Sequence, residues 1–532
     1  MAEFSIDIGV KHENRHGAHR GPDSSPRPFM MTPSCGSRVT LSAIWAMLSA
    51  GLLVYSQVLA LYADEGFHLL ASQLINAGKR PYLDFFYQHV PLYAYLNAGV
   101  FRIVGDSWRV PHAISALCSG AAAWLAASFV LHRVPDPPWR LPVAVTAALL
   151  IGLNALVIQY GTVGHPFGLC LLLVVTAFRL VILAVEREKG WLAAAAGLCA
   201  GAAAASSLLT APVAPILLFW MLRYHRAGAR WPKAAWFLGG ALLPFLPLLW
   251  LAVQGPRRVF FNVVEYHLFF RQRYEATVSA NILDDLRTVF DLWLGSTQGL
   301  LLILLAVLGL LFLAGHEWAP AERAELVLCG WLAGGLGLYL SCTYPVWRQY
   351  FILVIPFLGV LAAVGVYALG TRVWMSSRRP AWLTLSVVVL FTLGLARPAI
   401  STGQNFMFFS KRWQLVEAIA RAVNEVTPAE QDVYCYDEFV FFVSGRIPPT
   451  GLENSFSRDV QLPLRLAEFL RVRSPDQLDR DLAAGRFATV VVEYDDPKVE
   501  AFELPRRYAG RTRIGTIEIF WGRVGGDKKA GH

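Results

Sequence analysis

Long apolar segments recur along this chain and constrain its fold more than any other feature of the sequence. A helix of about 17 to 25 apolar residues is long enough to cross the hydrocarbon core of a bilayer. Such runs occupy Val39–Leu61, Leu141–Ile158, Phe167–Val185 and Leu353–Leu369. Because 55% of the 532 residues are hydrophobic and only 16% are charged, a water-soluble globule around one core is excluded. We therefore predict a polytopic α-helical membrane protein.

The two ends of the chain differ from this apolar middle, residues 39–402. Residues 1–38 are polar and have no apolar stretch followed by a small-residue cleavage site, so we interpret them as a disordered cytoplasmic leader and not a signal peptide. Met30 or Met31 could equally be the first residue. From residue 403 the charge rises and the apolar runs shorten. We expect a soluble α/β domain over residues 403–525, followed by a short tail over 526–532.

Within this soluble domain the pattern predicts three strands and two helices. Lys411–Val426 has helical spacing, and Ser474-Pro-Asp-Gln477 has the residues of a helix start with a capping box. The predicted strands are Asp432–Tyr436, Phe487–Tyr494 and an alternating strand at Thr512–Trp521.

Loop charges predict the topology. The segment of residues 91–104 is short for a membrane span and contains the polar residues Asn97 and Arg102, so it is marginal as a span and plausible as an interfacial or half-inserted helix. If it does not cross, all four basic loops lie on the cytoplasmic side, and if it does cross, all four lie outside. The positive-inside rule therefore favours no crossing, which gives about 11 spans. The first loop (62–90), the long loop (255–296) and the soluble domain then lie on the exoplasmic or periplasmic face of the cytoplasmic (inner) membrane. The basic loops are His132–Arg140, Glu186–Lys189, Arg223–Lys233 and Arg372–Arg379.

The positive charge of the chain does not indicate a nucleic-acid partner. The net charge is +9, but Lys and Arg lie in short segments between apolar runs and not on one basic face. The seven cysteines are scattered and suggest neither a disulfide framework nor a metal site. We therefore expect the chain to contact membrane lipid and to bind no nucleic acid.

Adjacent carboxylates follow the first apolar run, at Asp64 and Glu65. At the water edge of a membrane an acidic side chain ionises at little cost. Residues 63–77 have helical spacing, which predicts a helix along the membrane surface with Asp64 at its start, where the helix dipole favours an anion. An ionised carboxylate there suits a general base. The alternative is that Asp64 only caps the helix and Glu65 supports its first turn.

Several motifs of the first loop together resemble one enzyme family. They are the Asp64-Glu65 pair, a Gly78 to Asp84 turn with Pro-Tyr-x-Asp, Pro-Leu-Tyr93-x-Tyr-Leu, and Phe101-Arg-Ile-Val-Gly-Asp-Ser107. This pattern is similar to the GT-C integral-membrane glycosyltransferases, and most of all to family 39, with its protein O-mannosyltransferases and its aminoarabinose and lipopolysaccharide-core sugar transferases. The similarity covers most of the membrane part and is strongest over Tyr62–Leu131.

The resemblance implies a function. Such enzymes move a sugar, with inversion, from a polyprenyl-phosphate carrier to an acceptor lipid, glycan or protein at the outer face of the membrane. By that resemblance Asp64 is the catalytic base, with Glu65 beside it, and Asp84 and Tyr93 belong to the substrate-binding loop.

A second similar segment is Thr343-Tyr-Pro-Val-Trp-Arg348-Gln-Tyr350. It implies that Arg348, with Tyr350, contacts the donor phosphate, since guanidinium geometry suits phosphate oxygens. The alternative is an Arg that only snorkels to the interface. Many relatives have a Lys in the first loop where this chain has Gln88 and His89. Phosphate recognition would then depend on a protonated His89, on Arg348, or on Arg271 and Arg273 of the long loop.

Two other loops carry candidate substrate contacts. His165 stands near the position where relatives often have a second acid, and it either contacts substrate or packs against Tyr160. Residues 260–274 interleave aromatic and cationic side chains, which suits either a wall of the lipid-carrier groove or an interfacial anchor. Asp437 and Glu438 are expected at a solvated strand end.

Other functions stay open at this stage. A transporter or flippase of lipid-linked glycans would need ionisable groups near mid-membrane and paired broken helices, and neither pattern is clear here. A non-catalytic relative is a further alternative, because the Lys and the second acid are absent. No metal-ligand spacing exists beyond Asp64-Glu65, so we expect no cofactor and no metal requirement.

Overall fold

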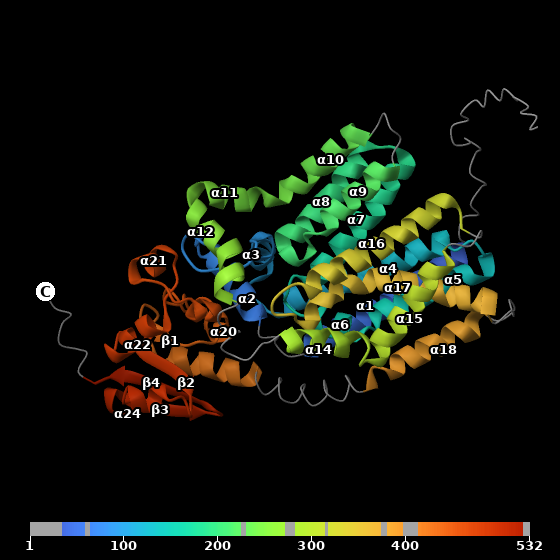
Figure 1. The fold of residues 1–532 in the computed structure, drawn as a ribbon. Helices are drawn as coiled ribbons and strands as arrows, with labels where there is room; N and C mark the ends of the chain where they lie inside the picture. The colour runs from blue at the N-terminus through green and yellow to red at the C-terminus, as the bar shows by residue number, and fades with distance from the viewer. Residues whose placement is uncertain are drawn as a thin grey trace, which may run out of the picture.

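The computed structural model describes residues 34–58, 64–224, 230–271, 282–313, 318–373, 380–396 and 413–524. A bundle of helices occupies most of the molecule, and a small sheet domain from the end of the chain lies against one end of this bundle (Figure 1). The predicted leader, apart from residues 34–38, and the predicted tail lie outside the described residues.

The bundle has the composition of a membrane domain. Within the described ranges, six helices are long and apolar enough to cross a membrane, or seven if α14 and α15, bent by 75°, form one span. The predicted fold class is confirmed, and the number of 11 spans stays a prediction. The helices are α1 (Cys35–Val58), α4 (Arg109–Arg133), α5 (Pro137–Gly152), α6 (Ala155–Tyr160), α7 (Phe167–Arg187), α8 (Gly190–Ser206), α9 (Val213–Tyr224), α10 (Arg230–Leu242), α11 (Leu246–Gln254), α14 (Ile282–Trp293), α15 (Thr297–Phe312), α16 (Pro320–Ser341), α17 (Ile355–Ala368) and α18 (Pro380–Leu393).

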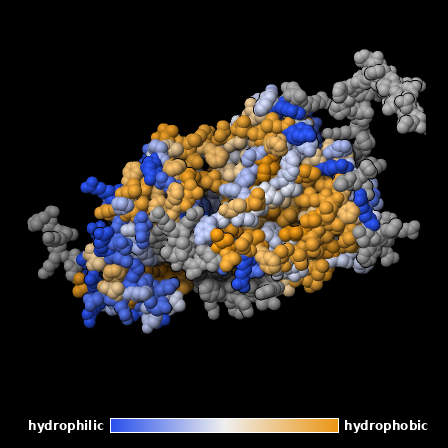
Figure 2. Space-filling view, viewed as in Figure 1, coloured by the Kyte–Doolittle hydropathy of each residue, from blue (hydrophilic) through white to orange (hydrophobic). Residues whose placement is uncertain are grey.

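The surface of the bundle is apolar over a broad area. Figure 2 shows hydrophobic residues over the helices and hydrophilic residues over the sheet domain. Large side chains that point outward include Trp236, Leu249 and Leu311. An exposed apolar area of this extent suits contact with lipid and would be unstable in water.

Small residues let two of these helices approach closely. A Cβ at Gly197 of α8 would lie 1.9 Å from the carbonyl oxygen of Phe237, and a Cβ at Gly240 of α10 would lie 2.0 Å from that of Ala194. No larger residue fits there. Gly197 lies in the Ala-rich run of residues 193–205, and such small residues are typical of close helix contacts in membranes.

Helix α4 runs from one end of the bundle to the other. Near its start His112 contacts Glu65 of the first loop, and at its last residue Arg133 pairs with Glu186 of α7 and Glu325 of α16. These contacts lie about 30 Å apart, since an α-helix rises 1.5 Å per residue. The basic loops that begin at residues 132 and 186 are therefore at the opposite end from the first loop. Which end faces the cytoplasm stays a prediction.

The sheet domain has four strands in the order β1-β2-β4-β3. β1 (Val433–Tyr434) is parallel to β2 (Thr489–Glu493), and β4 (Ile517–Arg523) is antiparallel to both β2 and β3 (Tyr508–Ile514). The single strand predicted at Thr512–Trp521 is wrong, because Gly515 with φ +61° turns the chain there and makes a hairpin. Alternation continues on both sides of so short a turn and therefore hides it.

Helices cover this sheet domain and include the predicted ones. Residues 413–426 are helical, and the capping box of Ser474 and Gln477 is confirmed. The other helices are α20 (Glu438–Ser444), α21 (Leu464–Phe469), α22 (Pro475–Ala483), α23 (Lys498–Ala501) and α24 (Leu504–Arg507).

Four short helices lie between the bundle and the sheet domain (Figure 1): α2 (Glu65–Asn76), α3 (Leu92–Val104), α12 (Pro256–Phe260) and the π-helix η4 (Phe261–Phe270). The position of α2 along the membrane surface stays a prediction, but the helix is enclosed by protein. Ten of its 12 residues are buried. The sheet domain covers it, and Phe439 packs directly over Gly66. This cover comes from residues more than 350 positions later in the chain, so local spacing cannot reveal it.

We predict that Gly66→Leu loosens the contact between the first loop and the sheet domain. A Cβ at Gly66 would already lie 3.2 Å from the Phe439 ring. Overpacking of this kind costs about 1–3 kcal/mol. Thermal unfolding of the purified protein should show a lower midpoint. Gly99→Leu is the control, since nothing lies within 4 Å of a Cβ there. Equal midpoints for both variants would contradict the prediction.

Candidate active site

Asp64 lies at the start of α2 and at the edge of a cavity. It occupies the N-cap position, but its side chain makes no capping hydrogen bond. The interpretation of Asp64 as a simple cap is therefore wrong. Asp64 lines a cavity of about 1360 Å³, and the other residues that line this cavity belong to the sheet domain. The carboxylate of Asp64 is thus placed where a ligand of this cavity can reach it.

Tyr160, at the end of α6, connects Asp64 electrostatically with Arg348. Burial raises the pKa of Tyr160, the positive charge of Arg348 opposes this, and the negative charge of Asp64 adds to it. Both charges are therefore close to the same hydroxyl group. A candidate base and a candidate phosphate ligand that are separated by 284 positions in the sequence therefore both act on Tyr160.

Glu65 is fully buried and holds four parts of the chain together. Its two oxygens accept hydrogen bonds from His112 Nε2 at 3.0 and 2.9 Å, and Oε2 also accepts from the Gly164 N–H at 2.8 Å. The other ring nitrogen of His112 lies 2.8 Å from the carbonyl oxygen of Ser56. Both ring nitrogens face acceptors, so both carry protons and the pair is ionic. This gives Glu65 a positioning role for its neighbour Asp64.

Four histidines form one cluster: His68 and His165 are buried, and His89 and His267 are partly buried. The ring of His68 lies 4.9 Å from that of His89 and 5.0 Å from that of His165, and His267 lies 6.2 Å from His89. Burial is the main cause that lowers the pKa of each, to about 3 for His165 and about 4 for His267. The cluster is therefore neutral at physiological pH. The sequence suggested a protonated His89 in place of the Lys that many relatives have in the first loop. The lowered pKa of His89 does not favour that charged form.

His68 is the centre of this cluster. Its Nδ1 lies 2.8 Å from the Tyr87 hydroxyl, and its Nε2 is buried with no hydrogen-bond partner in the described part of the chain. Tyr93 lies edge-on to it, with ring centres 5.3 Å apart. His165 stacks on Phe167 at 4.2 Å. Tyr93 and His165, both predicted from the sequence, therefore belong to one group with His68.

The Gln88-His89 segment is held from two sides. The Gln88 side chain accepts a hydrogen bond from Asn454 of the sheet domain at 2.5 Å, and its carbonyl oxygen accepts one from His267 at 2.6 Å. The His89 ring stacks on Phe67 at 5.2 Å. The sheet domain and η4 together therefore fix this part of the first loop.

The predicted cations separate into two places. Arg271, at the end of η4, donates a hydrogen bond to the Tyr350 hydroxyl at 3.0 Å, and its charge contributes to the lowered pKa values of His89 and His267. Arg348 is 57% exposed and faces Asp291 at 3.8 Å. Arg273 lies outside the described residues. Arg271 is thus the described cation that borders the histidine cluster.

Asp84 does not line the cavity with Asp64. It pairs with Arg80 at 3.0 Å and closes the turn of the first loop. Burial tends to raise the pKa of Asp84, but the hydrogen bonds and the charge of Arg80 outweigh burial and lower it. Asp84 therefore stabilises the loop, and its contact with substrate stays a prediction.

The solvated strand end expected at Asp437 and Glu438 is wrong. Glu438 is only 6% exposed, and burial raises its pKa to about 7. Asp437 caps α20 by accepting the Phe439 N–H at 3.0 Å. Both residues line the same cavity as Asp64. The sheet domain therefore contributes acidic groups to the site.

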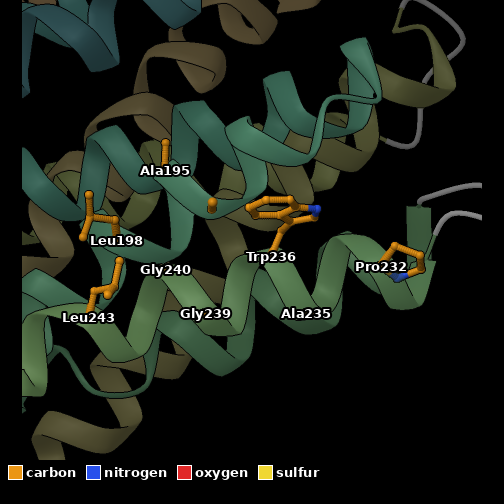
Figure 3. Close-up of a pocket in the computed structure, with 9 residues that line it drawn as sticks. Ala195, Leu198, Pro232, Ala235, Trp236, Gly239, Gly240 and Leu243 are labelled. Atoms are coloured by element: carbon orange, nitrogen blue, oxygen red, sulfur yellow. The ribbon is translucent and has the colours of Figure 1, made fainter.

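A second cavity, of about 750 Å³, lies between α8 and α10 (Figure 3). Trp236, Leu198 and Leu243 line it, together with small apolar residues and Pro232, and it contains no titratable side chain. None of the predicted site residues borders it. Across the described ranges, no group of three or more His, Cys, Asp or Glu side chains is arranged to hold a metal ion.

The sequence analysis missed His68, His112, His267 and Asn454. Two of these had a signal: His68 lies four residues after Asp64 and thus on the same side of the helix, and His112 is a polar residue inside an apolar run. His267 and Asn454 reach the site only through tertiary contacts, which no local pattern reveals.

Comparison with known proteins supports the class of the fold. No family model and no curated protein matches the sequence. Among solved structures, ArnT from Cupriavidus metallidurans bound to undecaprenyl phosphate superimposes with a TM-score of 0.63 at 15% identity, over 91% of this chain and 98% of that one. The oligosaccharyltransferase AglB from Archaeoglobus fulgidus, in complex with an inhibitory peptide and a dolichol-phosphate, gives 0.51 at 13% identity, over 91% and 74%.

These similarities define the fold as that of the GT-C membrane glycosyltransferases. The fold implied by the motifs of the first loop is thereby confirmed. At such low identity the similarity extends to the fold, and the roles of individual residues have to come from this chain itself.

We predict that Glu65→Ala destabilises the protein by about 3 kcal/mol, because it leaves a buried, protonated His112 without its counter-charge. Thermal unfolding of the purified protein measures the change. Arg506→Ala is the control, since it breaks an exposed pair with Glu503 that is worth less than about 1 kcal/mol. A Glu65→Ala protein as stable as this control would contradict the buried ion pair.

We also predict that the neutral histidine cluster makes the protein less stable in mild acid. The folded pKa of His267, about 4, lies below the ordinary value of 6.5, so the unfolded chain alone takes up a proton as the pH falls between these values. The contribution approaches about 1.4 kcal/mol for each pH unit. His267→Gln can keep the hydrogen bond to Gln88 and should show a smaller fall in melting temperature between pH 7.5 and 5. An unchanged fall would contradict the prediction.

Proposed function

We propose that the protein is an inverting glycosyltransferase, which moves a sugar from a polyprenyl-phosphate carrier to an acceptor at the exoplasmic face of the cytoplasmic membrane. The observation that carries the proposal is the position of Asp64, at the edge of a large cavity and close, through Tyr160, to Arg348. Two proteins with the same fold were solved with undecaprenyl phosphate or dolichol-phosphate. This supports a lipid-phosphate-linked donor.

In the proposed reaction Asp64 acts as general base. It takes the proton from the acceptor hydroxyl or amine, whose lone pair attacks the anomeric carbon from the face opposite the phosphate. The new glycosidic bond forms as the bond between the anomeric carbon and the phosphate oxygen breaks. The electron pair leaves with the polyprenyl phosphate, and the configuration at the anomeric carbon inverts. Neither a metal nor another cofactor takes part in the proposed reaction.

The leaving phosphate needs stabilisation on the side away from the acceptor. Arg271 and Tyr350 are linked by a hydrogen bond and border the histidine cluster, where neutral ring N–H groups can donate to phosphate oxygens. Arg348 is distant from Asp64 in the sequence, but the charges of both residues act on the Tyr160 hydroxyl group. Arg271 is therefore proposed as the main phosphate ligand, with Arg348 as a second cation near the reacting centre.

Asp64→Asn should lower sugar transfer by about 10²- to 10⁴-fold, the usual contribution of a general base. The measurement is incorporation of radiolabel from a panel of polyprenyl-phosphate monosaccharides into membranes that contain the protein, and it also identifies the donor. Asp106→Asn is the control, because it removes the same charge from an exposed position that does not line the cavity, and Asn can still accept the hydrogen bond from Gln73. Equal transfer by wild type and Asp64→Asn, or no transfer from any donor, would move the function toward a transporter or a non-catalytic relative.

Arg271→Lys should raise the KM for the donor about tenfold with a smaller effect on kcat, because Lys keeps the charge but loses the planar fork that binds phosphate. Arg348→Lys should have a weaker effect on KM, since Arg348 is more exposed and also faces Asp291. Steady-state kinetics at varied donor concentration compare the two. A larger effect at Arg348 would reverse the proposed roles.

A further inference from the structure

The cavity at Asp64 has walls of unusual charge. Its lining includes six acidic residues and one basic residue, in a chain whose net charge is +9. Asp64 comes from the first loop, and the other five acids come from the sheet domain. The acids are Asp64, Asp437, Glu438, Glu493, Asp495 and Asp496, and the base is Lys498.

Lys498 does not offset this acidity. Its ammonium pairs with Asp479, which lies outside the lining of the cavity. The backbone N–H of Lys498 is bonded to the Asp496 side chain at 2.8 Å, so Asp496 also closes the local turn. Glu493 and Asp495 are exposed and flank that turn after β2. The two carboxylates are therefore accessible to a ligand in the cavity.

Aromatic rings share the cavity with these acids. Tyr436, Phe439 and Phe456 all line it. An aromatic face attracts a cation, and it also packs against the apolar face of a sugar ring. Carboxylates next to aromatic rings form a surface that suits a protonated amine on a polyhydroxylated molecule. A phosphate group would be repelled by the same surface.

The charges on the two sides of Asp64 differ in sign. Arg348 acts near Tyr160, and Arg271 borders the histidine cluster, whereas the cavity toward the sheet domain is acidic. A lipid phosphate fits the first side and an acceptor fits the second. A general base between them would take a proton from a molecule in the acidic cavity.

We propose that this cavity is the acceptor site and that it selects an acceptor bearing a protonated amine over a phosphorylated one. The inference rests on the proposed glycosyltransferase function, because it assigns the acidic side of Asp64 to the acceptor. It deepens that function by naming the charge of the acceptor. The sheet domain then determines specificity through groups that do not take part in the chemistry.

Equilibrium binding to the full-length protein in detergent micelles tests the proposal. The probes are a glucosamine trisaccharide, its neutral N-acetylated counterpart, and the N-acetylated trisaccharide carrying one phosphate. At low salt the amine probe should bind about tenfold more tightly than the neutral probe, and the phosphorylated probe should bind most weakly. The preference should shrink at high salt, because the cavity is open to water and its charges are screened.

The double variant Glu493→Gln/Asp495→Asn should weaken binding of the amine probe about fivefold and leave the neutral probe unchanged. Glu425→Gln/Glu468→Gln is the matched control, because it removes the same charge from exposed sheet-domain positions that do not line the cavity. Equal binding of all three probes, no binding of any probe, or an equal loss in the control variant would overturn the proposal.

Sugar transfer separates this inference from the proposed function. If the wild-type protein transfers sugar in an Asp64-dependent way but shows no preference for the amine probe, only the assignment of acceptor charge fails. If the amine probe binds as expected but no polyprenyl-phosphate donor supports transfer, the proposed function fails and the cavity remains a site for cationic ligands.

Discussion

The buried ion pair between Glu65 and His112 is the interaction on which the rest of the site depends. Breaking such a pair by removing one partner costs several kcal/mol, because the remaining charge stays buried. Through this pair the first loop is fixed to α1, α4 and the loop at Gly164. Asp64 immediately precedes Glu65 in the chain. Its direction toward the cavity therefore follows from a contact that is itself closed to substrate.

This arrangement divides the work of two adjacent carboxylates. Glu65 is fully buried with a full set of hydrogen-bond donors, which holds the carboxylate in place and leaves it no role as a proton acceptor for a substrate. Asp64 lines an open cavity. In the sequence the two residues look alike. Their difference arises because α2 begins between them, so the helix directs one side chain into the protein and leaves the other at its end.

Much of the fold could be predicted from the sequence, because span length and loop charge are local properties. The helical membrane domain and the small sheet domain near the end of the chain are examples. The predictions that failed concern features that depend on contacts between distant parts of the chain. The sheet domain buries α2, encloses Glu438 and holds Gln88 through Asn454. The turn at Gly515 was missed for another reason, because the alternation of apolar and polar residues continues through a short hairpin.

The sheet domain therefore has two physical roles that follow from the same packing. It covers α2, the helix that carries His68, and burial is the main cause that lowers the pKa of His68 and His89. By standing opposite Asp64 it supplies the acidic wall of the cavity. The neutral, hydrogen-bonding side therefore depends on burial, whereas the acidic side includes the exposed carboxylates of Glu493 and Asp495. Loss of this cover would expose the rings to water, raise their pKa values toward 6.5 and remove the difference in character between the two sides.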